Sequence, residues 1–223
     1  MSVWIKICGN TSLADARLAV DAGADAVGFV FAPSPRNVTV SEVAAIVAHL
    51  PASVEKIGVF VDAGFEDIYA TVRLCGLTGV QLHFEAAAGL PAKIHDRLGS
   101  PLRILRVVHF EDGAAARISE QIAEHACDPH VDGVLVDSRT AKAVGGTGVA
   151  FNWAAARKAV FRNVGELKLI AAGGLNPANV SKAIATLKPW GVDVVSGVET
   201  SPGRKDPEKV RAFVAKARAA KSR

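Results

Sequence analysis

The sequence predicts an α/β fold, a single-domain (β/α)8 (TIM) barrel. Short β-branched apolar runs alternate with Ala-rich amphipathic stretches along the whole chain, and eight units of each kind can be distinguished. The 223 residues then divide into about 28 per unit, close to a minimal βα unit. Strict alternation implies parallel strands with right-handed crossovers, and eight such units are typical of the closed barrel.

The predicted strands are runs of Val, Ile, Leu or Phe that are too short to be helices. In chain order they span residues 3–7, 26–31, 55–61, 79–83, 102–108, 132–136, 167–171 and 192–195. The predicted helices follow them at residues 12–22, 41–49, 65–75, 90–98, 114–126, 152–160, 177–187 and 206–220. Three helices have start signals, namely Ser41 before Glu42, the pair Asn176–Pro177, and the pair Asp206–Pro207.

The alternative architecture is an open, doubly wound sheet. That fold usually has a glycine-rich GxGxxG fingerprint after its first strand, whereas this chain continues with Cys8-Gly9-Asn10-Thr11. The loop therefore favours the barrel. No linker-like segment divides the chain, so residues 1–223 are expected to form one barrel domain.

Composition excludes several classes of protein. Half of the residues are hydrophobic and 22% are charged, which excludes intrinsic disorder, and no apolar run is long enough for a membrane span. The net charge of +4 comes from the end of the chain, because residues 204–223 carry eight Lys or Arg and two Asp or Glu. We read this as a solvated helix face and expect no nucleic-acid partner.

The cysteines and the N-terminus indicate the compartment. Cys8, Cys75 and Cys127 are an odd number without a CxxC pair, which argues against a disulfide framework or a structural zinc site and fits a reducing environment. The first residues lead directly into a strand, so no signal peptide is expected. We expect a cytoplasmic protein.

In such barrels the active site lies at the C-terminal ends of the strands. Side chains alternate along a strand, so Lys6 and Cys8, Gln81 and His83, and Asp137 are predicted to face the interior. Burying these groups without partners or a function is costly, which makes them candidates for a site. Taken singly, each has a simpler interpretation: an inert buried thiol, a core histidine, or a carboxylate that braces a loop.

Glycine clusters follow three late strands. Gly145-Gly146-Thr147-Gly148 follows the sixth, Gly173-Gly174 the seventh, and Gly197 and Gly203 the eighth. Glycine lets the backbone approach a ligand closely, and the loops after strands seven and eight frequently bind phosphate in this fold. A tight turn explains any one pair, but pairs after both strands favour a phosphorylated ligand.

Together these segments resemble the phosphoribosylanthranilate isomerase family of tryptophan biosynthesis, from the first strand to the last helix. The matching segments are Lys6–Thr11, Ala24–Phe31, Ser34–Arg36, Gly58–Val61, Val80–His83, Leu135–Ser138, Gly145–Gly148, Phe151–Trp153, Ala172–Val180, Val192–Glu199 and Gly203–Asp206. The chain departs from the family at Phe84, usually Gly, at Asn152, usually Asp, and at Val195, usually Ser.

The resemblance implies an Amadori rearrangement of N-(5-phosphoribosyl)anthranilate to 1-(2-carboxyphenylamino)-1-deoxyribulose 5-phosphate. Asp137 resembles the family's general acid and Cys8 its general base. The base must be partly thiolate, which an electropositive neighbourhood favours. Lys6 is one candidate source of that field, and Arg106 is another if it faces inward.

The resemblance also implies the substrate contacts. Arg36 resembles the residue that binds the anthranilate carboxylate, and His83 and Asp193 resemble substrate-positioning residues. Gly173, Gly174, Ser196 and Gly197 match the phosphate loops. No metal or organic cofactor is expected, because the imine intermediate is its own electron sink.

Two alternatives stay open. Another phosphosugar-processing barrel enzyme, such as an epimerase or indole-glycerol-phosphate synthase, would share the late glycine loops. A non-catalytic metabolite-binding barrel would have no reason to keep both Cys8 and Asp137 at facing strand ends. The helices carry mixed Ala, Lys and Glu, so a monomer is favoured over a homodimer, with no membrane partner.

Overall fold

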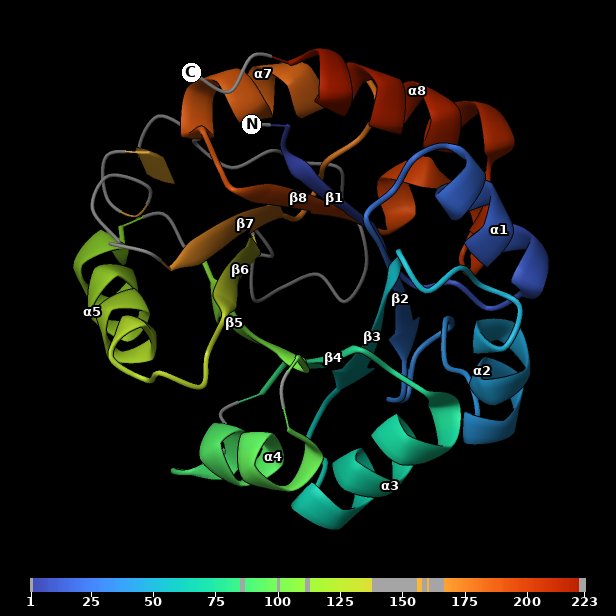
Figure 1. Cartoon of the computed structure of the whole chain (residues 1–223). Helices are drawn as coiled ribbons and strands as arrows, with labels where there is room; N and C mark the ends of the chain where they lie inside the picture. Colours follow the sequence, from blue (N-terminus) through green and yellow to red (C-terminus); the bar gives the residue numbers. More distant parts are fainter. Residues whose placement is uncertain are drawn as a thin grey trace.

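The computed structural model describes residues 2–84, 87–99, 101–110, 113–137, 156–157, 160 and 167–220. Eight parallel strands form a closed barrel in chain order, and the helices surround it (Figure 1). The predicted fold class is therefore confirmed. The strands are β1 (Trp4–Ile7), β2 (Ala26–Val30), β3 (Glu55–Phe60), β4 (Gly79–Leu82), β5 (Arg103–His109), β6 (Gly133–Asp137), β7 (Lys168–Ala172) and β8 (Gly191–Val194).

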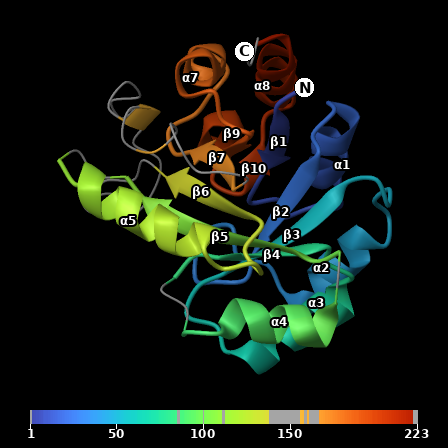
Figure 2. The same cartoon turned by 60° about the vertical axis from the view of Figure 1, so that its left-hand side comes forward.

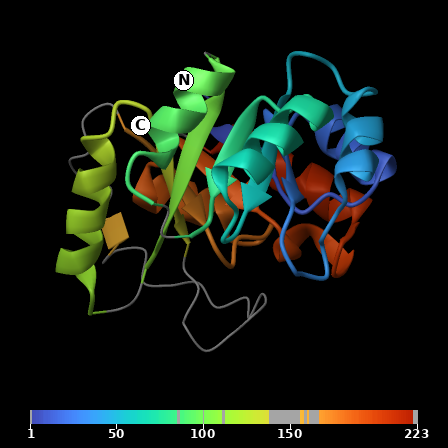
Figure 3. The same ribbon diagram turned by 90° about the horizontal axis from the view of Figure 1, so that it is seen from below.

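Seven α-helices lie in the described part of the chain. They are α1 (Leu13–Asp21), α2 (Val40–Val47), α3 (Phe65–Cys75), α4 (Leu90–Leu98), α5 (Ala115–Ala126), α7 (Val180–Leu187) and α8 (Pro207–Ala219). Seen from below, α3 and α4 lie next to each other across the near side of the barrel (Figure 3). Most of the predicted helix 152–160, the glycine cluster at 145–148 and Ser138 lie outside the described residues.

The helix starts test the predicted caps. Asp206 caps α8 by accepting from the backbone N–H groups of Glu208 and Lys209, with Pro207 at the first helical position, as predicted. The Ser41 start is wrong, because Thr39 caps α2 in a reciprocal capping box with Glu42.

The predicted start of the seventh helix at Asn176–Pro177 is also wrong. The Asn176 side chain accepts from Ala178 N–H at 2.8 Å and so forms a turn ahead of the helix. The helix itself begins at Val180, with Asn179 as its N-cap.

Two apolar clusters stabilise the barrel. The larger packs the outward side chains of the strands against the helices, through residues such as Ile5, Ile7 and Val136. The smaller fills the barrel interior and consists of Trp4, Ala26, Ile57, Leu105, Leu135, Ile170 and Ala172. Trp4 stacks on Trp190 with ring centroids 5.1 Å apart and closes the N-terminal end of the barrel. The polar interior positions therefore lie towards the opposite, C-terminal end.

A short hairpin follows β8 and is not predicted by periodicity. A 3-10 turn, η1 (Ser196–Val198), leads into β9 (Glu199–Ser201) and β10 (Arg204–Lys205), which pair antiparallel. The hairpin lies close to β1 in Figure 2. Thr11 Oγ1 donates to the Gly203 carbonyl at 2.6 Å, so the hairpin meets the loop after β1.

Among the residues that the structure describes, no helix is long and apolar enough to cross a membrane.

Candidate active site

Lys6 lies at the centre of the polar interior. Its side chain is fully buried, and Nζ donates to Gln81 Oε1 at 2.9 Å and to Asp193 Oδ1 at 3.0 Å. These contacts place Lys6 and Gln81 inside the barrel, as the strand alternation predicts. Lys6 and Asp193 are also register partners on β1 and β8. One ammonium group thus joins three strands.

The ion pair keeps this lysine charged. Burial lowers the pKa of Lys6, but the charges and hydrogen bonds of Asp193 and Cys8 together outweigh it, so the pKa of Lys6 lies above its ordinary value. A buried cation of this kind exerts a strong field on its neighbours because little water screens it. The nearest thiol is that of Cys8.

The Cys8 peptide is held on both sides. Its N–H donates to the Val194 carbonyl at 2.9 Å, and its own carbonyl accepts from Lys205 Nζ at 2.6 Å. Gly28 leaves room for the thiol, since a Cβ there would lie 2.5 Å from Cys8 Sγ and 3.0 Å from Lys6 Cε. Because Gly28 has no side chain, the Cys8 and Lys6 side chains can pack directly against the backbone of β2.

Opposing influences act on the Cys8 thiol. Burial raises its pKa above the ordinary value, although Lys6 and Lys205 each lower it. The net rise means that the cations offset the desolvation of the thiolate only in part.

Arg106 is not a source of positive field at Cys8. It shares its parity on β5 with Ile104 and Val108, which belong to the outer cluster, whereas Leu105 faces the interior. Burial lowers the pKa of His125 on α5, and the charge of Arg106 lowers it further, so Arg106 acts on the helix side of the strand. Arg106 therefore does not meet the condition, an inward orientation, on which it was a candidate source of positive charge. Lys205 supplies the second positive charge instead.

Asp137 ends β6 and is 7% exposed. It is the register partner of His109 at the end of β5, and the ring centroids of His83 and His109 lie 5.2 Å apart.

Ligand atoms of His83, His109 and Asp137 lie within 4.8 Å of one another, so this group could hold a transition metal ion. His95, Asp96 and His130 form a second such group. Asp137 also acts electrostatically on Asp193, which links the two parts of the site.

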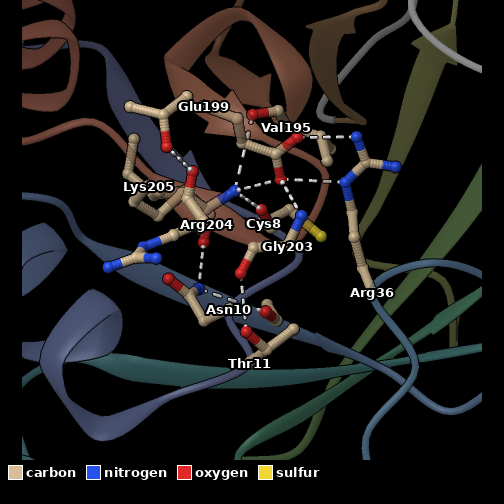
Figure 4. Close-up of polar contacts among 12 residues, drawn as sticks. Cys8, Asn10, Thr11, Arg36, Val195, Glu199, Gly203, Arg204 and Lys205 are labelled. Carbon is tan, nitrogen blue, oxygen red and sulfur yellow. Dashed lines mark hydrogen bonds and ion pairs between the residues drawn. The ribbon is translucent and has the colours of Figure 1, made fainter.

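Arg36 is paired side-on with a carboxylate of the chain itself. Its Nε donates to Glu199 Oε1 at 2.8 Å and its Nη2 to Glu199 Oε2 at 2.6 Å. Gly9, with φ +71°, lies beneath it, since a Cβ there would come within 2.8 Å of Arg36 Cδ and 3.2 Å of Val195 Cγ1. Figure 4 shows the Glu199 carboxylate between the Arg36 guanidinium and the Lys205 ammonium.

The two late glycine loops lie against each other. Gly173 and Gly174 both have positive φ, and a Cβ at Gly197 would collide with the Leu175 carbonyl oxygen. Ser196 and Gly197 form the start of η1. The structure thus brings the four predicted phosphate-loop residues to one place at the C-terminal end of the barrel.

Three residues of this region were not among the predicted site residues. Glu199 and Lys205 are 7% and 4% exposed and form an ion pair at 3.1 Å. His109 lies beside His83 and Asp137. His109 follows Leu105 and Val107 on the inward face of β5, but both faces of this strand carry apolar and basic residues, so the alternation alone does not indicate it. The hairpin has no periodic pattern that would indicate burial of Glu199 or Lys205.

Comparison with known protein families gives one consistent match. The family model for N-(5'phosphoribosyl)anthranilate (PRA) isomerase matches residues 5–216. An N-(5'-phosphoribosyl)anthranilate isomerase of Pelobacter propionicus is 41% identical, covering 95% of this chain and 94% of its own length. One of Myxococcus xanthus is 42% identical, covering 100% and 98%.

Solved structures agree. Phosphoribosyl anthranilate isomerase of Thermotoga maritima superposes with a TM-score of 0.85 at 36% identity, covering 96% of this chain and 98% of its own. Two further structures have TM-scores of 0.79 at 34% identity, each covering 96% and 98%. One is a complex with reduced 1-(o-carboxyphenylamino)-1-deoxyribulose 5-phosphate. The other shows monomers of the dimeric Thermotoga maritima enzyme.

Proposed function

The chain belongs to the N-(5'-phosphoribosyl)anthranilate isomerase family, and we propose that Cys8 and Asp137 are the base and the acid with which it catalyses the isomerisation. The reaction is a step of tryptophan biosynthesis that converts an aminoaldose into an aminoketose. One observation carries the assignment: a buried thiol lies beside the buried ammonium of Lys6 at the same barrel end as the buried carboxyl group of Asp137.

The first step needs an acid. A proton from Asp137 goes to the furanose ring oxygen as the bond between that oxygen and C1′ breaks, and the nitrogen lone pair forms the C=N bond of a protonated Schiff base. The general acid works best where it is held within hydrogen-bond reach of the atom it protonates. Asp137 lies at the end of β6, where strand ends meet the substrate in this fold.

The second step needs a base. The Cys8 thiolate removes the proton at C2′, the electrons of that bond form the C1′–C2′ double bond, and the iminium nitrogen becomes neutral. The resulting enolamine tautomerises to the ketone. A raised thiol pKa makes the thiolate scarcer but more basic, while Lys6 and Lys205 limit the rise. The imine accepts the electrons, so no cofactor is needed for either step.

The remaining predicted residues bind the substrate. Arg36 would donate hydrogen bonds to the anthranilate carboxylate, a partner suited to guanidinium. His83 and Asp193 would orient the ribose portion. The phosphate would lie at Gly173, Gly174, Ser196 and Gly197, where glycine allows close approach of the backbone to an anion.

The test is turnover by the purified protein. We expect the anthranilate fluorescence of N-(5'-phosphoribosyl)anthranilate to fall, and carbon NMR to show the C2′ ketone of the product. The alternative of another phosphosugar-processing enzyme predicts no ketone from this substrate and turnover of a pentose phosphate lacking the aryl amine. Binding without turnover would favour the metabolite-binding alternative.

We also expect a cytoplasmic monomer. Val61 and Leu74 are the large hydrophobic side chains that are exposed among the described residues, and two such residues do not make an apolar interface of the usual size. All three cysteines are free thiols, which suits a reducing compartment. Sedimentation of the purified protein would separate monomer from dimer.

A further inference from the structure

The β9–β10 hairpin contacts two loops of the proposed site. The tip residue Gly203 has φ +80°, and a Cβ there would lie 3.1 Å from the Pro35 carbonyl oxygen and 3.3 Å from Thr11 Cγ2. Thr11 belongs to the loop after β1 and Pro35 to the loop after β2. The hairpin therefore packs between the loop that contains Cys8 and the loop that contains Arg36.

A continuous chain of polar contacts runs through this hairpin. Lys205 Nζ contacts the Cys8 carbonyl at 2.6 Å and Glu199 Oε1 at 3.1 Å. Glu199 then accepts two hydrogen bonds from the Arg36 guanidinium, at 2.8 Å and 2.6 Å. Figure 4 shows this order directly, from the Cys8 carbonyl to Lys205, Glu199 and Arg36.

The mode of pairing leaves one edge of Arg36 directed elsewhere. Glu199 engages Nε and Nη2, which is the side of the guanidinium. A guanidinium has five N–H groups in a planar fork, so the Nη1–Nη2 end retains the geometry to bind a second carboxylate bidentately. Glu199 thus does not replace a ligand carboxylate but fixes the plane in which Arg36 would receive one.

We propose that Glu199 and Lys205 are positioning residues, which hold the Cys8 peptide and the Arg36 guanidinium in a fixed relation so that one substrate meets both. This inference rests on the proposed roles of Cys8 and Arg36. It assigns the specificity for an aryl carboxylate to a pair of residues that contact Arg36 rather than to Arg36 by itself.

Burial supports a dedicated role. Both side chains are nearly inaccessible, with Lys205 4% and Glu199 7% exposed. Taking two charges out of water costs several kcal/mol per ion. An apolar pair of similar volume is often as stable as a buried ion pair, so stability alone does not explain these two charges. Both charged groups also have backbone partners. The Cys8 and Val195 carbonyls accept from Lys205, and Gly203 N–H donates to Glu199 at 3.3 Å.

Burial and the neighbouring charges act against each other at both Glu199 and Lys205. Burial opposes ionisation of Glu199, yet Arg36 and Lys205 hold its pKa below the ordinary value. Burial lowers the pKa of Lys205, against the charges of Glu199 and Cys8. Lys205 in turn lowers the pKa of Cys8. Loss of the Lys205 charge should therefore make the thiol harder to ionise.

The first experiment compares two substrates. Glu199→Gln is assayed with N-(5'-phosphoribosyl)anthranilate and with its aniline counterpart, in which hydrogen replaces the carboxylate. We expect KM for the carboxylated substrate to rise about tenfold, with KM for the aniline compound unchanged. Glu208→Gln, on the exposed start of α8, is the matched control and should match the wild type. An equal rise of KM for both substrates would overturn the role of Glu199.

The second experiment titrates the thiol without substrate. In a Cys75→Ala/Cys127→Ala background, the pH dependence of Cys8 alkylation by iodoacetamide is compared for Lys205→Met and for Arg204→Met, an exposed neighbour on β10. We expect the Lys205→Met midpoint to move to higher pH and the Arg204→Met midpoint to stay. An unmoved Lys205→Met midpoint would overturn the role of Lys205.

Two provisions keep the outcomes separable. If Lys205→Met does not fold, the double variant Glu199→Gln/Lys205→Met, which removes both charges, takes its place with the same expected midpoint shift. Wild-type protein without turnover would contradict the proposed function, whereas the alkylation midpoint would still decide whether Lys205 acts on Cys8. If the wild type turns over normally but Glu199→Gln keeps the wild-type KM and Lys205→Met keeps the wild-type alkylation midpoint, the positioning role is contradicted and the proposed function is not.

Discussion

Lys6 and Asp193 face each other on the first and last strands of the barrel, with Nζ and Oδ1 3.0 Å apart and both side chains buried. They are 187 residues apart in the chain and are register partners where β1 closes against β8. The same ammonium group reaches Gln81 on β4. The contact therefore links side chains of β1, β4 and β8 and supplies positive charge beside Cys8.

Breaking this pair should be strongly destabilising. Lys6→Met leaves the Asp193 carboxylate buried without its cation, and such changes cost about 3–5 kcal/mol. Urea unfolding would measure the loss. Lys182→Met, at an exposed position of α7, should change the unfolding free energy by less than about 0.5 kcal/mol. A loss for Lys6→Met no larger than for Lys182→Met would contradict the ion-pair assignment.

Arg36→Met should act mainly on substrate binding. It removes the guanidinium that is proposed to bind the anthranilate carboxylate, so we expect KM to rise by roughly tenfold to a hundredfold with a smaller change in kcat. Steady-state kinetics would give both values, with Arg17→Met on the exposed face of α1 as control. An effect confined to kcat would argue against a carboxylate clamp.

Gly28→Ala should displace the thiol. The new Cβ would lie 2.5 Å from Cys8 Sγ, and overpacking a buried site costs about 1–3 kcal/mol. We expect lower turnover and a lower melting temperature. Gly64→Ala is the matched control, because its Cβ would meet nothing closer than Asp67 Oδ2 at 3.8 Å. Equal turnover of the two variants would show that Cys8 does not depend on the space at Gly28.

The Cys8 thiol should make stability depend on pH. Because burial raises its pKa in the folded chain, its contribution is complete below the unfolded thiol pKa of about 8.5 and is lost as pH rises through the folded value. The difference in unfolding free energy between wild type and Cys8→Ala should therefore shift against the wild type from pH 8 to pH 10. Cys127→Ala, at an exposed thiol, should show no such trend, and a constant Cys8→Ala difference would refute the raised pKa.

The fold and the interior lysine could be predicted because they depend on local patterns. Alternation of apolar runs gives the eight strands, and the parity of Ile5 and Ile7 directs Lys6 inward. On β5 the same reasoning fails, because both faces carry two apolar residues and one arginine. One face consists of Arg103, Leu105 and Val107, and the other of Ile104, Arg106 and Val108. Packing against α5 decides that Arg106 faces outward, and that contact has no local signature.

The hairpin partners could not be predicted for a related reason. Glu199 and Lys205 lie in a charged segment that is typical of a solvated surface, and Lys205 meets Cys8 across 197 residues of chain. Their burial follows from how the hairpin packs on the loops after β1 and β2. Only the three-dimensional arrangement shows that Arg36 already has a carboxylate partner.

The most direct measurement is the fluorescence time course of N-(5'-phosphoribosyl)anthranilate with wild type, Asp137→Asn, Cys8→Ala and the control Cys75→Ala. Cys75 is also a buried thiol, but it ends α3 on the outer side of the barrel. We predict that the wild type and Cys75→Ala turn over substrate alike, while Asp137→Asn and Cys8→Ala are folded and lose about a hundredfold or more in kcat. Near-normal turnover of either folded variant would contradict the assignment of Cys8 and Asp137 as base and acid.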